Sequence, residues 1–279
     1  MSDISQSSEL NVHDILIKLV EQIPQNEVAI SLSAGIDSAS VLFALLECGK
    51  KVIVYSFTLD RKESTDFLCA KQLASTFGLK FVPVILPTDL NVLYNDLITL
   101  HNRYGCIKKT EYECSWAFLY LCKMVEQEVM ATGMAADGHF VISKRGAIHF
   151  KNSCKKFREA YFSSPNKCQI LQRYKMAKEN NFEFFEPYLS EEIYQYLLNT
   201  TWYECNTPHQ KMPIRRAFDY GKYMKVRNHT NFQLGDSGIS TLFEELLNTK
   251  YNSHNYKSVV GIYNSINRGD VLNGKRKLI

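Results

Sequence analysis

The sequence lacks any apolar run approaching the ~18 residues that a membrane-spanning helix needs. Its first residues, MSDISQSSELNVHD, also lack the basic and apolar regions of a secretory signal peptide. Charge of one sign is scarce too, because 33 Lys and Arg residues face 29 Asp and Glu residues, a formal net charge of +4. Such a weak excess does not by itself argue for nucleic acid as a partner. These absences, with 45% hydrophobic residues, favour a soluble globular protein, and we expect a cytoplasmic location.

Paired cysteines are also missing, although the chain has eight cysteines. None stands in a C-x-x-C arrangement, which argues against a zinc knuckle and against a thioredoxin-like redox motif. In a cytosolic chain we expect small core residues or free thiols rather than disulfides. The eight are Cys48, Cys69, Cys106, Cys114, Cys122, Cys154, Cys168 and Cys205. A persulfide-carrying role for one of them stays open.

The most informative stretch runs from Glu27 to Ser40, EVAISLSAGIDSAS. Its apolar start is typical of a strand buried on both faces of a parallel sheet, and helical periodicity begins at Ser38. Between them, Ser33 to Ser38 form a turn of small residues, where backbone N–H groups at a helix N-terminus can approach an anion. No Gly-Lys-Ser/Thr follows at the spacing of a Walker A loop. We therefore expect a phosphate cradle of another kind.

Strand and helix patterns alternate around this turn. The expected elements are helix 11–23, strand 28–32, helix 38–46, strand 51–59, helix 64–77, strand 80–86, helix 89–101, helix 116–128 and strand 129–132, with a loop reaching over the site at 102–114. This order predicts an α/β fold with a doubly wound parallel sheet, which binds ligands at the carboxyl ends of its strands.

Beyond Val141 the pattern predicts helices and no strands. The expected helices cover 155–162, 167–180, 191–200, 213–223 and 241–247. We therefore predict two parts, an α/β domain over residues 1–145 and a mainly helical part over residues 146–279 that completes the active site.

Five landmarks occur in a fixed order along the chain. They are the turn Ser33-Ala34-Gly35-Ile36-Asp37-Ser38, the strand Tyr55-Ser56-Phe57-Thr58, the turn Thr132-Gly133-Met134-Ala135-Ala136-Asp137, the triplet Pro187-Tyr188-Leu189, and Lys211-Met212-Pro213-Ile214-Arg215-Arg216-Ala217-Phe218. Together they resemble the synthetase domain of the asparagine synthetase and β-lactam synthetase family, within the ATP pyrophosphatase (PP-loop) superfamily. The first resembles that family's Ser-Gly-Gly-x-Asp-Ser loop, and the last its Lys-x-x-Leu-Arg-x-Ala-Phe element.

The resemblance implies an adenine nucleotide alpha hydrolase-like fold and a ligase that adenylates a carboxylate, releases pyrophosphate and forms an amide with ammonia or an amine. ATP and Mg²⁺ are the cofactors that it implies. Lys211 and Asp137 would be catalytic, and Asp37 and Asp137 would hold the metal. The nucleotide-binding residues that it implies are Ser31, Leu32, Ser33, Gly35, Asp37, Ser38, Phe57, Gly133 and Arg215.

Three departures from the family qualify this interpretation. Ala34 replaces the first glycine of the loop, and Met134 replaces the glutamate expected to take a proton or orient the nucleophile. A thioether cannot act as a general base. The loop begins at residue 33, which leaves no room for an N-terminal glutaminase domain, so we expect a small carboxylate with free ammonia, an amine donor, or a separate ammonia-supplying partner.

Several alternatives remain open from the sequence. The chain could adenylate a nucleobase or tRNA for amination or thiolation, or could be a degenerate nucleotide-binding protein. Among single residues, Asp37 could only cap its helix, Asp137 could belong to a simple turn, and Lys211 could be a solvated surface charge.

Overall fold

A five-stranded parallel sheet lies at the centre of the computed structural model, which describes residues 11–33, 35–163, 170–226, 237–272 and 275–276. The strands are β1 (Glu27–Ser31), β2 (Lys51–Leu59), β3 (Lys80–Leu86), β4 (Val129–Ala131) and β5 (Glu183–Phe185). They pair in the order β3-β2-β1-β4-β5, and every pair is parallel. The predicted parallel α/β sheet is therefore confirmed.

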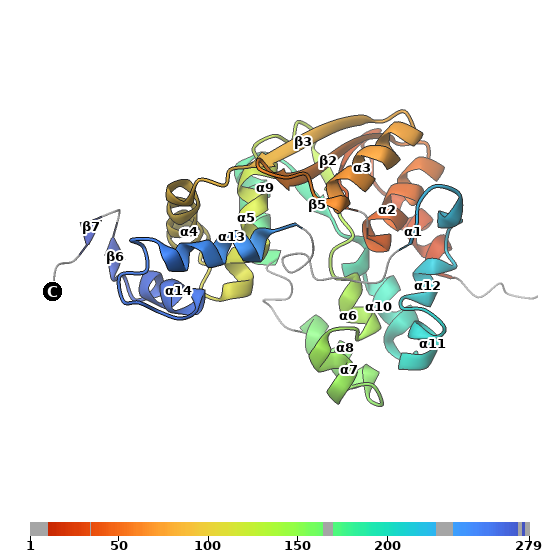
Figure 1. Ribbon diagram of the computed structural model, residues 1–279. Helices are drawn as coiled ribbons and strands as arrows, with labels where there is room; N and C mark the ends of the chain where they lie inside the picture. Colours follow the sequence, from red (N-terminus) through yellow and green to blue (C-terminus); the bar gives the residue numbers. More distant parts are fainter. Residues whose placement is uncertain (1–10, 34, 164–169, 227–236, 273–274, 277–279) are drawn as a thin grey trace, which may run out of the picture.

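Helices cover both faces of this sheet (Figure 1). Val28 and Ile30 of β1 pack with α1 (Val12–Glu21), α2 (Ile36–Glu47) and α3 (Thr65–Thr76). Ala29, between them, faces the opposite core. That second core contains α4 (Leu90–Tyr104), α5 (Lys109–Leu121), α9 (Ile170–Glu179), α13 (Ile239–Glu245) and α14 (Val259–Asn267). The alternation along β1 shows why its apolar run is continuous: both of its faces are buried.

Shorter helices follow β4 and gather on one side of the sheet, as Figure 1 shows. They are α6 (Ala136–Phe140), α7 (Lys144–His149), α8 (Cys154–Ser163), α10 (Glu191–Leu198), α11 (Trp202–Asn206) and α12 (Met212–Arg215), with 3₁₀ turns η2 (Pro187–Leu189) and η3 (Tyr220–Lys222). A further 3₁₀ turn, η4 (Leu246–Asn248), follows α13 in the second core. The predicted helical C-terminal part is confirmed. Within the described ranges, no helix combines the length and apolar character needed to cross a membrane.

The helices-only prediction beyond Val141 is wrong at three short strands. β5 joins the central sheet beside β4, while β6 (Val271–Leu272) and β7 (Lys275–Arg276) form a separate antiparallel pair. Strands of two or three residues are too short to show a periodicity. The division at residue 145 stays a prediction, and β5 shows that the second part contributes a strand to the sheet.

The loop predicted at 102–114 is also wrong. α4 continues to Tyr104 and ends at Gly105, which has the left-handed φ of 75°. α5 then begins at Lys109. The Glu111 carboxylate accepts hydrogen bonds from the backbone N–H groups of Ile107 (2.8 Å) and Lys108 (3.1 Å), so this charged residue caps a helix rather than marking a loop.

The helix predicted at 213–223 is divided in the structure. α12 ends at Arg215, and η3 begins only at Tyr220. The rings of Phe218, Tyr220 and Tyr223 all pack around Phe43 of α2, with centroids 5.3–5.8 Å apart. Contact with the core therefore overrides the local helical pattern at this point.

The carboxyl ends of β1 and β4 define the topological switch point of the sheet. From β1 the chain proceeds outward to β2 and β3, whereas β4 and β5 lie on the other side of β1. In open parallel sheets ligands bind at such a point. The two small-residue turns, which follow β1 and β4 directly, therefore lie where a ligand is expected.

The central strand offers a test of this core. Ile30 is fully buried in β1, whereas Ile85 on β3 is 49% exposed. We expect Ile30→Val to lower the free energy of unfolding by about 1 kcal/mol and Ile30→Ala by about 2–5 kcal/mol, because each truncation leaves a larger cavity. Ile85→Ala should change it by less than about 0.5 kcal/mol. Urea denaturation followed by circular dichroism measures these differences; equal losses at both positions would contradict the placement of β1.

Candidate functional site

A buried lysine joins the two turns at the switch point. The Lys211 Nζ atom lies 2.5 Å from Asp37 Oδ2 and 2.6 Å from Asp137 Oδ1. Lys211 is only 3% exposed, so the alternative of a solvated surface lysine is wrong. Asp37 lies in the first turn of α2 after β1, Asp137 in α6 after β4, and Lys211 is the N-cap of α12. Three segments distant in the sequence therefore converge on one ammonium group.

The charge of Lys211 follows from this arrangement. Burial alone would lower the pKa of Lys211, but the carboxylates of Asp37 and Asp137 outweigh it and raise the pKa above the ordinary value of 10.5. Lys211 is therefore a cation at neutral pH, held between two anionic partners.

The first turn presents the N-terminus of α2. Gly35 is the N-cap of α2 in an extended conformation and makes no side-chain cap, and Asp37 is the second residue of the helix, so the alternative that Asp37 serves as its N-cap is wrong. The Ser33 hydroxyl accepts a hydrogen bond from the Gly35 N–H (3.1 Å), and the Ser38 hydroxyl accepts one from the Ser33 N–H (3.2 Å). The turn is thus held by its own serines, next to the positive end of a twelve-residue helix. Ala34 lies outside the described residues.

The second turn packs directly on the first. A Cβ atom at Gly133 would lie 2.4 Å from the Ser38 backbone N and 2.5 Å from the Asp37 backbone C. A side chain larger than a hydrogen atom does not fit there, so glycine lets the two turns touch. Ala135 then takes the left-handed φ of 71°, and α6 begins at Ala136 with Asp137 as its second residue. Asp137 is thus placed by a helix, which differs from the simple turn considered as an alternative.

The backbone of Lys211 is held by hydrogen bonds that link it to α6. Lys211 has a left-handed φ of 62°, and its N–H donates to the Asn206 side-chain oxygen (3.2 Å). The Asn206 amide in turn donates to the carbonyl oxygen of Phe140, the last residue of α6 (3.0 Å). One buried asparagine therefore ties the segment that carries Lys211 to the helix that carries Asp137.

The remaining predicted residues lie around these turns, with roles that stay predictions. Ser31 ends β1, and the Leu32 N–H donates to the Tyr55 carbonyl oxygen (2.9 Å). Phe57 is half-buried on β2 and packs against the core that contains α5 and α13. Arg215, at the end of α12, donates from Nε to the Gln210 carbonyl oxygen (2.7 Å), and burial lowers its pKa.

The sequence interpretation missed four residues that support the site. Tyr188 is fully buried, and its hydroxyl lies 2.6 Å from the Ser40 hydroxyl, which donates to the Asp37 carbonyl oxygen (2.7 Å). Asn206 is described above; the other two are Arg158 and Glu186. Only Tyr188 carried a signal, because it lies in the fourth landmark. The other three are isolated polar residues, and no local sequence pattern indicates that their side chains are buried.

Arg158 supports α6 from below. Its guanidinium is fully buried and donates to the carbonyl oxygens of His139 (2.7 Å), Leu198 (3.0 Å) and Thr200 (2.6 Å). His139 itself is a buried residue with Nε2 2.7 Å from the Tyr188 carbonyl oxygen, as expected for a structural histidine. α6 is therefore held at its C-terminal end by long polar side chains from the helical part.

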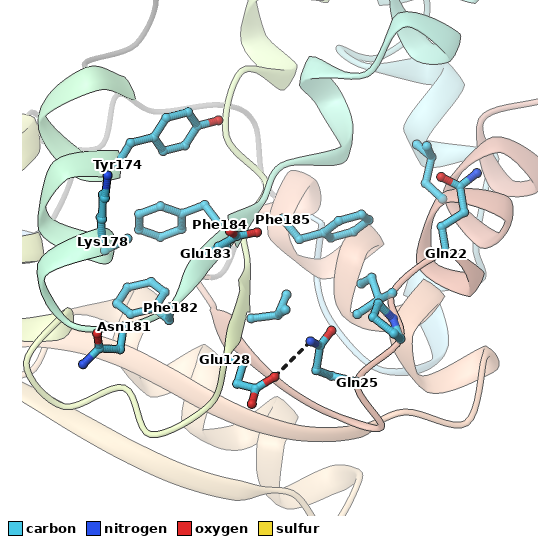
Figure 2. A pocket seen from close by; sticks show the side chains of 15 residues that line it. Gln22, Gln25, Glu128, Tyr174, Lys178, Asn181, Phe182, Glu183, Phe184 and Phe185 are labelled. Atoms are coloured by element: carbon cyan, nitrogen blue, oxygen red, sulfur yellow. Dashed lines mark hydrogen bonds between the residues drawn. The ribbon is translucent and has the colours of Figure 1, made fainter.

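A large open pocket lies elsewhere, at the free edge of β5 (Figure 2). Its volume is about 1220 Å³, and it is lined by the end of α1, by β5 and by α9. Tyr174, Lys178 and Phe185 line it, and Gln25 donates to Glu128 across its floor (3.0 Å). None of the predicted site residues lines this pocket. This pocket is therefore separate from the converging side chains of Lys211, Asp37 and Asp137.

The cysteines give little support to a thiol mechanism. Within the described residues seven cysteines are free, as expected, and Cys168 lies outside them. Burial raises the pKa of the Cys106 and Cys122 thiols to about 12, and it also raises the pKa of Cys154 and Cys205. These four thiols are protonated at neutral pH and are poor nucleophiles.

Comparison with known proteins gives matches to a family profile, to a curated protein and to solved structures. A family profile described as "Asparagine synthase" matches residues 19–231. The Microcin J25-processing protein McjC of Escherichia coli is 30% identical over 84 residues, which cover 30% of this chain and 16% of the length of that relative. The crystal structure of a predicted subunit of tRNA methyltransferase from Methanocaldococcus jannaschii is 14% identical, with a TM-score of 0.35 over 62% of this chain and 75% of that chain. The last likeness is too low to support an argument.

The ion pair of Lys211 predicts a pH dependence of stability. The pKa of Lys211 is raised in the folded state. The contribution of its ion pair to the free energy of unfolding is therefore complete below about pH 10.5 and is lost as the pH rises through the folded pKa. We expect Lys211→Met to lose about 3–5 kcal/mol at neutral pH, because two carboxylates remain without their cation. The deficit should shrink above about pH 10.5. Thermal melts against pH test this, with exposed Lys18→Met as the control; a deficit that stays constant to high pH would contradict it.

Proposed function

Because this chain belongs to the asparagine synthase family, we propose that it is an ATP-dependent ligase that adenylates a carboxylate and forms an amide with ammonia or an amine. The profile match covers residues 19–231, which include both turns and Lys211. The observation that carries the proposal is the convergence of Asp37, Asp137 and Lys211 at the switch point. The products would be AMP, pyrophosphate and the amide.

The two carboxylates fit a divalent metal. Asp37 and Asp137 supply hard oxygen donors that already converge within 2.6 Å of one cationic nitrogen. Mg²⁺ in nucleotide enzymes is held by one or two carboxylates together with substrate phosphates. Within the described part of the chain no cluster of three or more His, Cys, Asp or Glu residues could hold a metal ion, and this donor pair does not require one. When bound, Mg²⁺ would neutralise charge on the phosphates.

The phosphates would lie at the N-terminus of α2. The N-cap of α2 is Gly35, which makes no side-chain cap, and the first backbone N–H groups of a helix are suited to bind an anion. The hydroxyls of Ser33 and Ser38 add short polar groups beside it. In this proposal Gly35 provides an approach without a side chain, and Gly133 keeps the second turn close enough to take part.

Lys211 would stabilise developing negative charge. Its ammonium is buried, cationic and within 2.6 Å of the two carboxylates that would hold the metal, so it would lie close to the phosphates of a bound nucleotide. Preorganised donors in a site with little water typically contribute factors of 10²–10³ to the rate. With Mg²⁺ on the two carboxylates, Lys211 would be available to pair with a phosphate oxygen instead.

The acceptor half of the reaction differs from the family pattern at Met134. Met134 donates its backbone N–H to the Thr132 hydroxyl (3.2 Å), and its thioether cannot take a proton from the attacking amine. Two acidic residues in 102–114 could have taken the place of the missing glutamate. In the structure Glu111 caps α5, and Oε1 of the buried Glu113 lies 3.6 Å from the Lys109 Nζ atom. The product is therefore proposed as an amide in general, and asparagine is not assumed.

The proposal predicts Mg²⁺-dependent release of pyrophosphate and AMP. Purified protein with ATP would be screened against pools of amino acids, small carboxylic acids and nucleosides. We expect pyrophosphate release with a carboxylate pool, a loss of about 10²-fold or more in Lys211→Met, and little change in Lys18→Met. Fluorescent-nucleotide binding would show that Lys211→Met still folds and binds ATP.

Other outcomes of the same screen would overturn the proposal. Release of ADP and phosphate would show that ATP is cleaved between its β- and γ-phosphates, whereas the proposal requires cleavage between the α- and β-phosphates. Release of pyrophosphate only with nucleosides or tRNA would favour modification of a nucleobase. Binding of ATP with no release in any pool would favour a nucleotide-binding protein without turnover.

A further inference from the structure

A buried carboxylate lies beside the second turn at the carboxyl end of β5. Glu186 follows β5 directly, and its side chain is only 2% exposed. We propose that Glu186, acting through Thr132, is a positioning residue that fixes the orientation of Asp137 toward the divalent metal ion that Asp137 would bind. This inference rests on the proposed function, because it assigns Asp137 to the metal.

Both oxygens of Glu186 are held in place. Oε1 accepts from the Thr132 hydroxyl and from Arg173 Nη1, each at 3.2 Å, and Oε2 accepts from the Tyr174 hydroxyl at 2.9 Å. Arg173 is 1% exposed and lies over the rings of Phe118 and Phe184. Three donors from two elements thus determine the orientation of one carboxylate.

Thr132 passes this constraint to the second turn. Its Oγ1 donates to Glu186 and at the same time accepts from the Met134 N–H at 3.2 Å. The next residue, Ala135, has the left-handed φ of 71°, which an L-residue adopts only when its surroundings impose it. Asp137 follows two residues later on α6. The bonds of Thr132 therefore enforce the backbone course that aims Asp137.

The buried ion pair between Arg173 and Glu186 is not well explained by a contribution to the stability of the fold. A buried pair can often be replaced by apolar residues of similar volume without loss of stability, because the desolvation cost offsets the Coulomb attraction. At the carboxyl edge of the sheet, next to the turn that carries Asp137, its consequence is geometric. The pair Arg173–Glu186 gives Thr132 an acceptor whose orientation is held by hydrogen bonds from α9.

The main test removes one hydroxyl. Thr132→Val keeps the shape of the side chain but loses both bonds of Oγ1, and Thr132→Ser restores them. Mn²⁺ binding in the presence of ATP, followed by electron paramagnetic resonance, measures the metal site without turnover. We expect Thr132→Val to weaken Mn²⁺ binding about 10-fold, as for other residues that orient a metal ligand, and Thr132→Ser to recover most of it. Thr99→Val on α4, which loses a hydroxyl bonded to the Asn95 carbonyl oxygen, is the matched control.

A second variant separates positioning from stability. Glu186→Gln alone would leave the Arg173 guanidinium buried without its counter-charge, so both are replaced together as Arg173→Met with Glu186→Met. We expect a melting temperature close to that of the natural protein, with Mn²⁺ binding weakened about 10-fold. The concentration of Mg²⁺ that gives half-maximal pyrophosphate release should rise in parallel.

The outcomes distinguish this inference from the proposed function. Unchanged Mn²⁺ binding in Thr132→Val, or equal losses in Thr132→Val and Thr132→Ser, would overturn the role of Glu186. If the natural protein binds Mn²⁺ with ATP but releases no pyrophosphate with any substrate, the proposed function fails, and the Mn²⁺ measurements still decide the positioning role.

Discussion

The contact of one ammonium group with two carboxylates is the interaction on which the rest of the site depends. Lys211 and Asp37 are separated by 174 positions in the chain, yet their charged atoms lie 2.5 Å apart. The parallel sheet brings the turns after β1 and β4 together, and the helical part supplies the cation. Neither part forms the constellation alone. The sheet gives the site its place, and the helical part gives it its charge balance.

Support for this contact is built from hydrogen bonds to backbone groups. Arg158 and Asn206 donate to the last two carbonyl oxygens of α6, and Asn206 also accepts from the Lys211 N–H. Tyr188 reaches Asp37 through Ser40 on the other side. A five-residue helix has too few internal hydrogen bonds to be stable by itself. The side chains of Arg158 and Asn206 therefore hold α6, so the helical part contributes to the position of Asp137.

The sequence was informative where a pattern is local and repeated. The bounds of β2 and β3 are as predicted, and the Ser33–Ser38 turn, Asp137 and Lys211 could be found because each lies in a motif of several residues. β5 could not be predicted, since three residues show no period. Glu186 and Arg158 could not be found either, because a polar letter does not reveal that its side chain is buried by distant elements. The same limit explains why Glu111 looked like part of a loop, although it caps α5.

Without a ligand, Lys211 supplies an internal counter-charge to the two carboxylates of the site. With one ammonium between two carboxylates, the three side chains carry a local charge of −1 in place of −2. A bare divalent ion is therefore attracted less strongly than it would be by two unpaired carboxylates, and the polyanionic tail of a nucleotide is repelled less. Under the proposed function, a metal would gain most by arriving already attached to phosphate, because the phosphate would then pair with the lysine that the carboxylates release. The internal counter-ion would thus favour the complex of metal and nucleotide over either component alone.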